Sequence, residues 1–217
     1  MTLLRKSYPF PALREKEILR DAGCKEADEA TLSLMRSCID EAKPILTYEV
    51  CYTILPVEIR DNVCDFGCFS LVSQGLAKNL SSSHSVVLFA ATVGTALDRL
   101  IAKYGRISPS RALMMQAIGA ERIEALCDTF CQDISAELGT ALAPRFSPGY
   151  GDLPLSAQKD IFPILDPPRQ IGLTLNDSLL MSPSKSVSAF AGLTEKCNNT
   201  NKCSLCNNAN CSFRRVL

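Results

Sequence analysis

Residues 145–154, Arg-Phe-Ser-Pro-Gly-Tyr-Gly-Asp-Leu-Pro, place one cation and one aromatic ring in a segment rich in proline and glycine. Pro148 fixes one backbone angle, and Gly149 permits backbone conformations that are closed to most other residues. A rigid bend of this kind could hold the guanidinium of Arg145 and the phenol ring of Tyr150 around a small ligand. The alternative interpretation of a Pro/Gly segment is an ordinary connection before a helix.

A second set of chemically active residues lies near the C-terminus, where four cysteines follow the pattern Cys197-x5-Cys203-x2-Cys206-x4-Cys211. Thiolates at this density suit a tetrahedral site for zinc or an iron–sulfur cluster. A cluster could deliver an electron, whereas zinc would only fold a segment that has few apolar residues. The alternative is a flexible tail with free thiols. We predict a metal site that uses these four cysteines, with the choice between zinc and iron–sulfur left open.

The composition excludes several classes of function. The single histidine, His84, rules out a catalytic histidine dyad and a multi-histidine metal site. The formal net charge of zero argues against a nucleic-acid-binding surface, which needs a concentrated basic patch. The longest apolar run, residues 86–93, is too short to span a membrane, and the first residues lack the apolar core of a secretion signal. These features predict a cytoplasmic protein, in which the eleven cysteines are thiols or metal ligands rather than a disulfide framework.

The elements that must position these residues form, we predict, an α+β fold with an antiparallel sheet and several helices. Periodicity and breaker residues predict helices over residues 13–22, 27–42, 71–80, 96–103, 110–138 and 156–165. Strands are predicted over residues 47–55, 62–69, 85–91, 173–176 and 186–192. The elements do not alternate strictly, which favours α+β over a doubly wound sheet. We expect one domain over residues 1–193 and a cysteine-rich tail over residues 194–217.

The helix over residues 110–138 is the longest that the sequence predicts. Its buried face is expected to consist of Ala112, Met115, Ile118, Ile123, Leu126 and Phe130. Gly119 lies within this helix and predicts a close backbone approach at this position. The shorter helix over residues 156–165 is expected to end at Pro167 and Pro168, because proline disrupts a continuing helix.

Several segments carry one family pattern in order along the chain. The loop has the pattern R-x-x-P-G-Y-x-x-x-P, and residues 156–159 follow it as a polar helix start. Residues 171–188 fit the pattern I-G-x-x-L-x-x-S-x-x-M-x-P-x-x-S-V-S, and residues 116–126 are similar to a helix that carries a ligand-contacting glutamate. Together these segments resemble the activation domain of cobalamin-dependent methionine synthase, and the resemblance covers residues 85–192.

The resemblance implies a ligand and a role for each matching residue. That family binds S-adenosylmethionine, which has a carboxylate, an amine, a sulfonium and an adenine. Arg145 matches the arginine that grips the ligand, and its planar guanidinium suits the carboxylate. Glu124 matches the helix glutamate and would receive the ammonium; the alternative is a solvated glutamate paired with a nearby lysine or arginine. Gly149 and Tyr150 match the pair beside the adenosyl group and the cobalamin face, where an aromatic ring attracts the sulfonium.

The activity that the resemblance implies is reductive methylation, which reactivates a methionine synthase. Cobalt(II) cannot accept a methyl cation, whereas cobalt(I) can, and methyl transfer from the sulfonium pulls the unfavourable reduction forward. We expect a free-standing methyltransferase component, since no segment resembles a folate, homocysteine or cobalamin domain. The implied partners are a separate cobalamin-dependent methionine synthase or a related corrinoid protein, and a flavodoxin or ferredoxin-type electron donor.

Two other functions are kept as alternatives. The family has a tyrosine-bearing segment after the S-V-S strand, and here the residues from Leu193 onward are rich in cysteine and asparagine instead. This departure favours a non-catalytic partner of a corrinoid protein that keeps the fold without the ligand. The cysteine tail favours an iron–sulfur redox protein.

Overall fold

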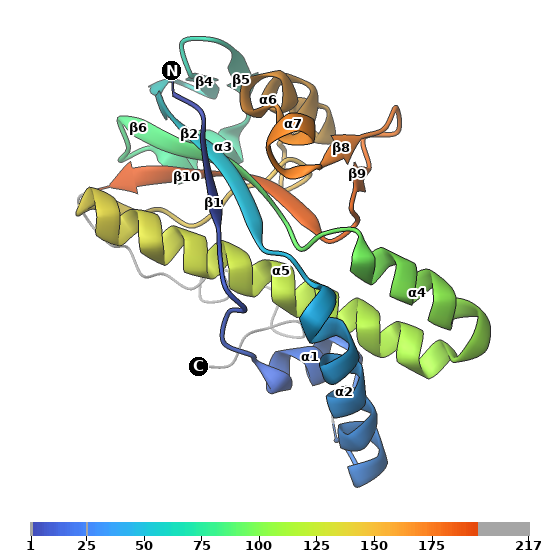
Figure 1. The fold of residues 1–217 in the computed structure, drawn as a ribbon. Coiled ribbons are helices and arrows are strands. Elements are labelled where there is room, and N and C mark those ends of the chain that lie inside the picture. The colour runs from blue at the N-terminus through green and yellow to red at the C-terminus, as the bar shows by residue number, and fades with distance from the viewer. Residues whose placement is uncertain (1, 25, 195–217) are drawn as a thin grey trace.

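The computed structural model describes residues 2–24 and 26–194, and its centre is a five-stranded antiparallel sheet (Figure 1). The strands occur in the order β1 (Leu4–Ser7), β2 (Glu49–Pro56), β6 (Ser85–Thr92), β10 (Ser186–Thr194) and β7 (Ala141–Leu142). The long strands are in register over their whole length, with Val50 opposite Ala91 and Ala189 opposite Phe89. This arrangement confirms the predicted α+β class.

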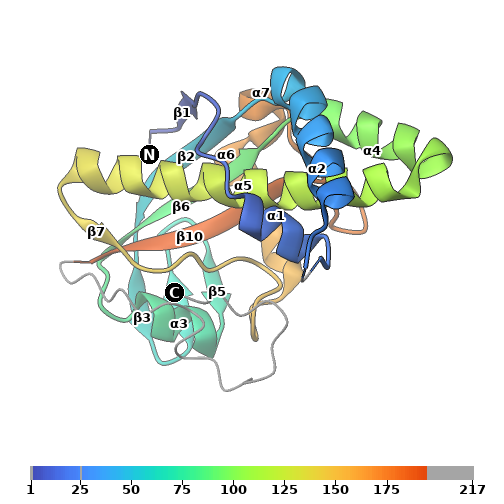
Figure 2. The ribbon, with the colours of Figure 1, turned by 90° about the horizontal axis from the view of Figure 1, so that it is seen from below.

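Helices cover both faces of the sheet, so its central strands are apolar on both sides. The helices are α1 (Glu15–Asp21), α2 (Glu29–Ala42), α3 (Gln74–Leu80), α4 (Ala96–Ile107), α5 (Pro109–Leu138), α6 (Gln158–Leu165) and α7 (Pro167–Ile171). On one face Phe89 packs with Phe130 of α5, and on the other Leu88 and Phe190 lie in the same core cluster as Leu76 of α3. Figure 2 shows α5 running across the sheet with α1, α2 and α4 beside it.

The long helix α5 matches its prediction closely. Met115, Ile118, Ile123, Leu126 and Phe130 are buried, and Ala112 is half-buried. The helix ends at Gly139, whose positive φ of 62° is the left-handed conformation that glycine adopts most easily. At Gly119 side chains rather than backbone come close, because a Cβ there would lie 2.6 Å from Leu97 Cδ2 and 2.8 Å from Lys185 Cγ.

Several predicted boundaries are wrong. Of the strand predicted over residues 62–69 only β4 (Val63–Asp65) is present, and it forms a small sheet with β3 (Glu58–Arg60) before it and β5 (Ser70–Val72) after it. The helix over residues 71–80 therefore begins only at Gln74, where the Ser73 side chain caps it. The predicted end of the helix at residue 165 is correct, but Pro167 starts α7 rather than ending α6, because a proline is tolerated in the first helical turn and Asp166, at φ 41°, has already ended α6.

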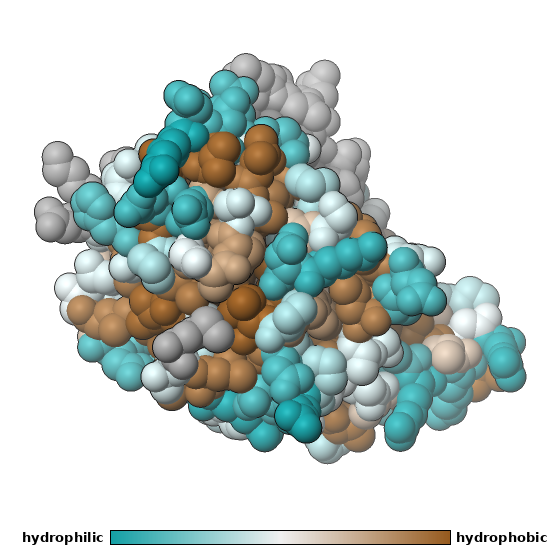
Figure 3. All heavy atoms as spheres, turned by 90° about the horizontal axis from the view of Figure 1, so that it is seen from above, coloured by the Kyte–Doolittle hydropathy of each residue, from teal (hydrophilic) through white to brown (hydrophobic). Residues whose placement is uncertain are grey.

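The remaining short elements are two 3-10 turns, η1 (Lys43–Ile45) and η2 (Leu155–Ala157), and the hairpin of β8 (Thr174–Leu175) with β9 (Met181–Ser182). The face seen in Figure 3 mixes apolar and hydrophilic side chains. The most exposed large apolar residues of the described chain are Val72, Leu180 and Ile107, which belong to separate elements. Over residues 2–24 and 26–194, none of the helices has both the length and the apolar character that crossing a membrane requires.

Candidate functional site

The Pro/Gly loop leaves the sheet directly after Phe146. The backbone of Phe146 forms a two-way bridge with Phe190 of β10, with N···O distances of 2.9 and 2.8 Å. The chain then reverses, and the Gly149 N–H donates to the Leu153 carbonyl at 2.9 Å. Gly149 has a φ of 89°, which side-chain-bearing residues rarely adopt. The bend predicted from proline and glycine is therefore present, and glycine is required for its shape.

Asp152 fixes the far end of this loop to the start of α3. Its carboxylate accepts hydrogen bonds from Ser73 Oγ at 2.6 Å, Gln74 N at 2.6 Å and Gly75 N at 3.0 Å. The hydrogen bond from Ser73 is the largest cause that lowers the pKa of Asp152, and the Gly75 N–H adds to it. A Cβ on Gly75 would lie 2.9 Å from Asp152 Oδ1 and 3.0 Å from the Phe146 ring, so glycine permits this contact. The loop is thus held at both ends.

The Tyr150 ring lies at the outer tip of the loop. The residue is 49% exposed, and its ring meets Phe146 edge to face at a centroid distance of 6.3 Å. The exposed face of such a ring is accessible to a ligand cation or to the surface of a partner protein.

Arg145 points toward α5 and contacts two carboxylates on that helix. Arg145 Nη2 donates to Glu124 Oε2 at 2.7 Å, and Nη1 donates to Asp128 Oδ1 at 2.5 Å. The side chain is only 16% exposed. Burial disfavours the charged guanidinium, but nearby groups, Cys127 and Asp128 foremost, outweigh it and raise the pKa of Arg145. The structure therefore brings Arg145 and Glu124 together, and it does so as an ion pair, which is the alternative named for Glu124.

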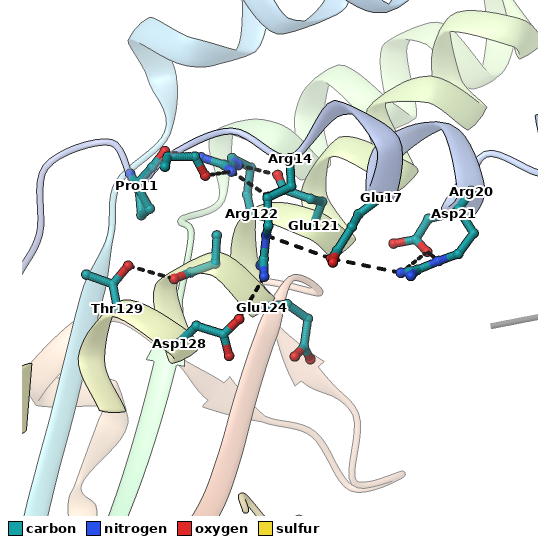
Figure 4. A network of polar contacts seen from close by, with 12 residues as sticks. Pro11, Arg14, Glu17, Arg20, Asp21, Glu121, Arg122, Glu124, Asp128 and Thr129 are labelled. Atoms are coloured by element: carbon teal, nitrogen blue, oxygen red, sulfur yellow. Dashed lines mark hydrogen bonds and ion pairs between the residues drawn. The ribbon is translucent and has the colours of Figure 1, made fainter. Parts of the chain in front are cut away.

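The ion pairs continue from Asp128 to the N-terminal part of the chain (Figure 4). Arg14, just before α1, donates through Nη1 to Asp128 Oδ2 at 2.7 Å and through Nε to Glu121 Oε1 at 3.1 Å. Glu121 in turn pairs with Arg122, and both side chains are fully buried. Arg122 also donates to the Pro11 carbonyl at 2.6 Å. The site is therefore a chain of alternating carboxylates and guanidinium groups along α5.

Sequence reasoning missed four members of this site, which are Arg14, Glu121, Arg122 and Asp128. Asp128 lies four residues after Glu124 on the same helix, so helical spacing could have placed both carboxylates on one face. Arg14 lies 114 residues before Asp128, and no local pattern indicates their contact.

The predicted metal ligands Cys197, Cys203, Cys206 and Cys211 lie outside the described residues, so the metal site stays a prediction. Within residues 2–24 and 26–194, histidine, cysteine and acidic side chains form no group of three or more that could hold a metal ion.

Comparison with solved structures identifies the class of protein that has this fold. A crystal structure of the MetH reactivation domain bound to AdoHcy matches with a TM-score of 0.65 and 14% sequence identity, covering 90% of this chain and 79% of that one. At this identity the likeness concerns the fold alone. No curated protein sequence matched.

A comparison of the sequence with family models identifies the family more specifically. A family model described as the activation domain of vitamin B12 dependent methionine synthase matches residues 75–203. The chain belongs to this family. The match includes α5 and the loop, and it confirms the resemblance drawn from the sequence segments.

Proposed function

We propose that the protein binds S-adenosylmethionine and supports reductive methylation of cobalamin held by a separate methionine synthase or a related corrinoid protein. Membership of the activation-domain family supports this proposal. The fold neighbour was solved with AdoHcy, which is S-adenosylmethionine without its transferable methyl group. The observation that carries the proposal is the ion pair between Arg145 and Glu124 beside the loop.

This ion pair suits a ligand that has both an ammonium and a carboxylate. In the free protein Arg145 and Glu124 satisfy each other at 2.7 Å. An amino-acid ligand could insert between them, so that its carboxylate takes the guanidinium and its ammonium takes the Glu124 carboxylate. Each charge then keeps a partner, which limits the cost of breaking the pair. At 37% side-chain exposure Glu124 is open enough for this exchange.

Gly149 and Tyr150 would hold the other end of the ligand. The Gly149 backbone, free of a side chain, allows close approach of an adenosyl group. The exposed Tyr150 ring can face the sulfonium and the incoming cobalamin. When bound, S-adenosylmethionine supplies the methyl group that cobalt(I) on the partner accepts, with the electron coming from a flavodoxin or ferredoxin-type donor. The protein's own contribution is to orient the ligand and exclude water.

Isothermal titration calorimetry with S-adenosylmethionine tests the proposal. Arg145→Ala should raise the Kd roughly 10- to 100-fold, since it removes charged hydrogen bonds to the ligand. Arg111→Ala is the matched control, because Arg111, which lies on α5, also pairs with a carboxylate, Glu41, at 2.8 Å. Arg111→Ala should change the Kd by less than about twofold. No binding to the wild type, or equal losses in both variants, would refute the proposed site.

A non-catalytic partner of a corrinoid protein is the second candidate function. It is favoured by the observation that the Arg145 guanidinium already has two carboxylate partners, Glu124 and Asp128. In that case the protein should bind a corrinoid methyltransferase in a pull-down while calorimetry detects no S-adenosylmethionine binding. In the primary case, adding the protein, S-adenosylmethionine and a reductant should bleach the cobalt(II) absorbance of the partner, and Tyr150→Ala should slow this change.

A further inference from the structure

Asp128 is shared by two arginines from distant parts of the chain. Arg145 Nη1 donates to Asp128 Oδ1, and Arg14 Nη1 donates to Asp128 Oδ2 at 2.7 Å. The Asp128 side chain is 30% exposed. Burial alone would raise the pKa of Asp128, but the two guanidinium groups outweigh burial and lower it. Both oxygens of a charged carboxylate are therefore engaged by a guanidinium.

Arg14 is itself held firmly against α5. Its Nε donates to Glu121 at 3.1 Å, and Glu121 is fully buried in its pair with Arg122. Figure 4 shows the Arg14 guanidinium lying between Glu121 and Asp128, with Glu124 beside Asp128. Because this guanidinium is anchored by a buried carboxylate, Arg14 can stay on Asp128 when Arg145 moves.

This arrangement bears on ligand binding because the ligand carboxylate would have to share the Arg145 guanidinium with Asp128 or replace Asp128 on it. A partly buried carboxylate without a partner is costly, so Asp128 resists the departure of Arg145 unless another cation remains. Arg14 is that cation. Without Arg14, Asp128 would depend on Arg145 alone and would compete with the ligand carboxylate for it.

We infer that Arg14 is a positioning residue of the S-adenosylmethionine site, which keeps Asp128 neutralised so that Arg145 can turn to the ligand carboxylate. The inference rests on the proposed function and extends it to a residue outside the matched segment 75–203. In this inference Arg14 acts through Asp128 and not by contact with the ligand, so its effect should be visible only through Asp128 and only for ligands that carry a carboxylate.

Calorimetry on the full chain tests this inference. Arg14→Met should weaken S-adenosylmethionine binding roughly tenfold, the value of about one charged hydrogen bond. Binding of 5′-methylthioadenosine, which lacks the amino-acid part, should not change. Adding Asp128→Asn to Arg14→Met should restore the affinity, because the competing charge is gone. Arg14→Lys should be intermediate, since it keeps the charge without the two-sided geometry of a guanidinium.

Arg20→Met is the matched control. Arg20 lies in α1, which Arg14 precedes, pairs with Asp21 at 3.0 Å and is 26% exposed, against 29% for Arg14. This variant should bind like the wild type. Circular dichroism and thermal unfolding establish that each variant is folded.

The outcomes separate the inference from the proposed function. If Arg145→Ala loses affinity and Arg14→Met does not, the inference on Arg14 is overturned and the proposed function stands. A loss in Arg14→Met that Asp128→Asn does not restore would mean that Arg14 only anchors α1, and would also overturn the inference. If the wild type binds no S-adenosylmethionine, both are overturned.

Discussion

The buried ion pair between Glu121 and Arg122 gives a sharp prediction for stability. Both side chains have 0% exposure, and Arg122 donates to Glu121 through Nε and Nη2, each at 2.6 Å. Arg122 also donates to the carbonyls of Pro11 and Ala12 at 2.6 and 2.8 Å. Glu121→Gln preserves the shape of the side chain but leaves the buried guanidinium without its counter-charge.

Removing one partner of a buried pair costs about 3–5 kcal/mol. The two carbonyl acceptors remain in Glu121→Gln, so we expect the lower end, about 3 kcal/mol. This is a large part of the roughly 5–15 kcal/mol that stabilises a folded domain. In urea, with a slope of about 1–3 kcal/mol/M, the unfolding midpoint should fall by roughly 1–3 M.

Glu137→Gln is the control for burial. Glu137 lies on the same helix and pairs with Lys6, but its side chain is 53% exposed. Pairs of this kind are worth about 0–1 kcal/mol, so the urea midpoint should hardly move. Equal losses of unfolding free energy in Glu121→Gln and Glu137→Gln would refute the reasoning, since burial would then not determine the cost.

Three further predictions concern the loop, its pH dependence and the tail. Gly75→Ala should displace the loop and lower both the unfolding temperature and S-adenosylmethionine affinity, because the added Cβ would lie 2.9 Å from Asp152 Oδ1. Gly105→Ala, where nothing lies within 4 Å, should instead stabilise helix α4 by about 0.5–1 kcal/mol in thermal unfolding. Hydrogen bonds, first that from Ser73, lower the pKa of Asp152 below 3.8. The contribution of Asp152 to the free energy of unfolding should therefore be complete above pH 3.8 and should vanish as the pH falls below it. The wild type should therefore lose more stability than Asp152→Asn in acid, and parallel acid-unfolding curves would contradict this. If the tail holds a metal, anaerobically purified protein should contain zinc or absorb visible light, and replacing both cysteines of the C-x-x-C pair with serine should abolish either signal.

Strong local signals account for the parts of the fold that could be predicted. The regular apolar spacing of α5 spans many turns, and the apolar run of β6 is bounded by polar residues. Predicting α5 and β6 therefore required no knowledge of their tertiary contacts. The bend of the loop followed from the backbone limits of Pro148 and Gly149, which act within a few residues.

Elements that depend on distant partners could not be predicted. Strand β1 has a largely exposed pattern, and only its pairing with β2 makes it a strand. The same limit applies to the site. The family pattern identifies Arg145 and Glu124, whereas Arg14 comes close to them only when the chain folds. Tertiary packing determines which carboxylate each arginine pairs with, and this choice cannot be predicted from composition or residue spacing.

The position of β2 has a practical consequence for work with fragments. Strand β6 hydrogen-bonds along its whole length to β2, Glu49–Pro56, which precedes the family match at residue 75. A fragment that begins at residue 75 would lack β2, and β6 would become an unpaired, apolar edge strand. Exposed edges of this kind pair with other chains and cause aggregation. The cooperative unit therefore includes the N-terminal strands, and any transplant of this domain into another protein should carry them.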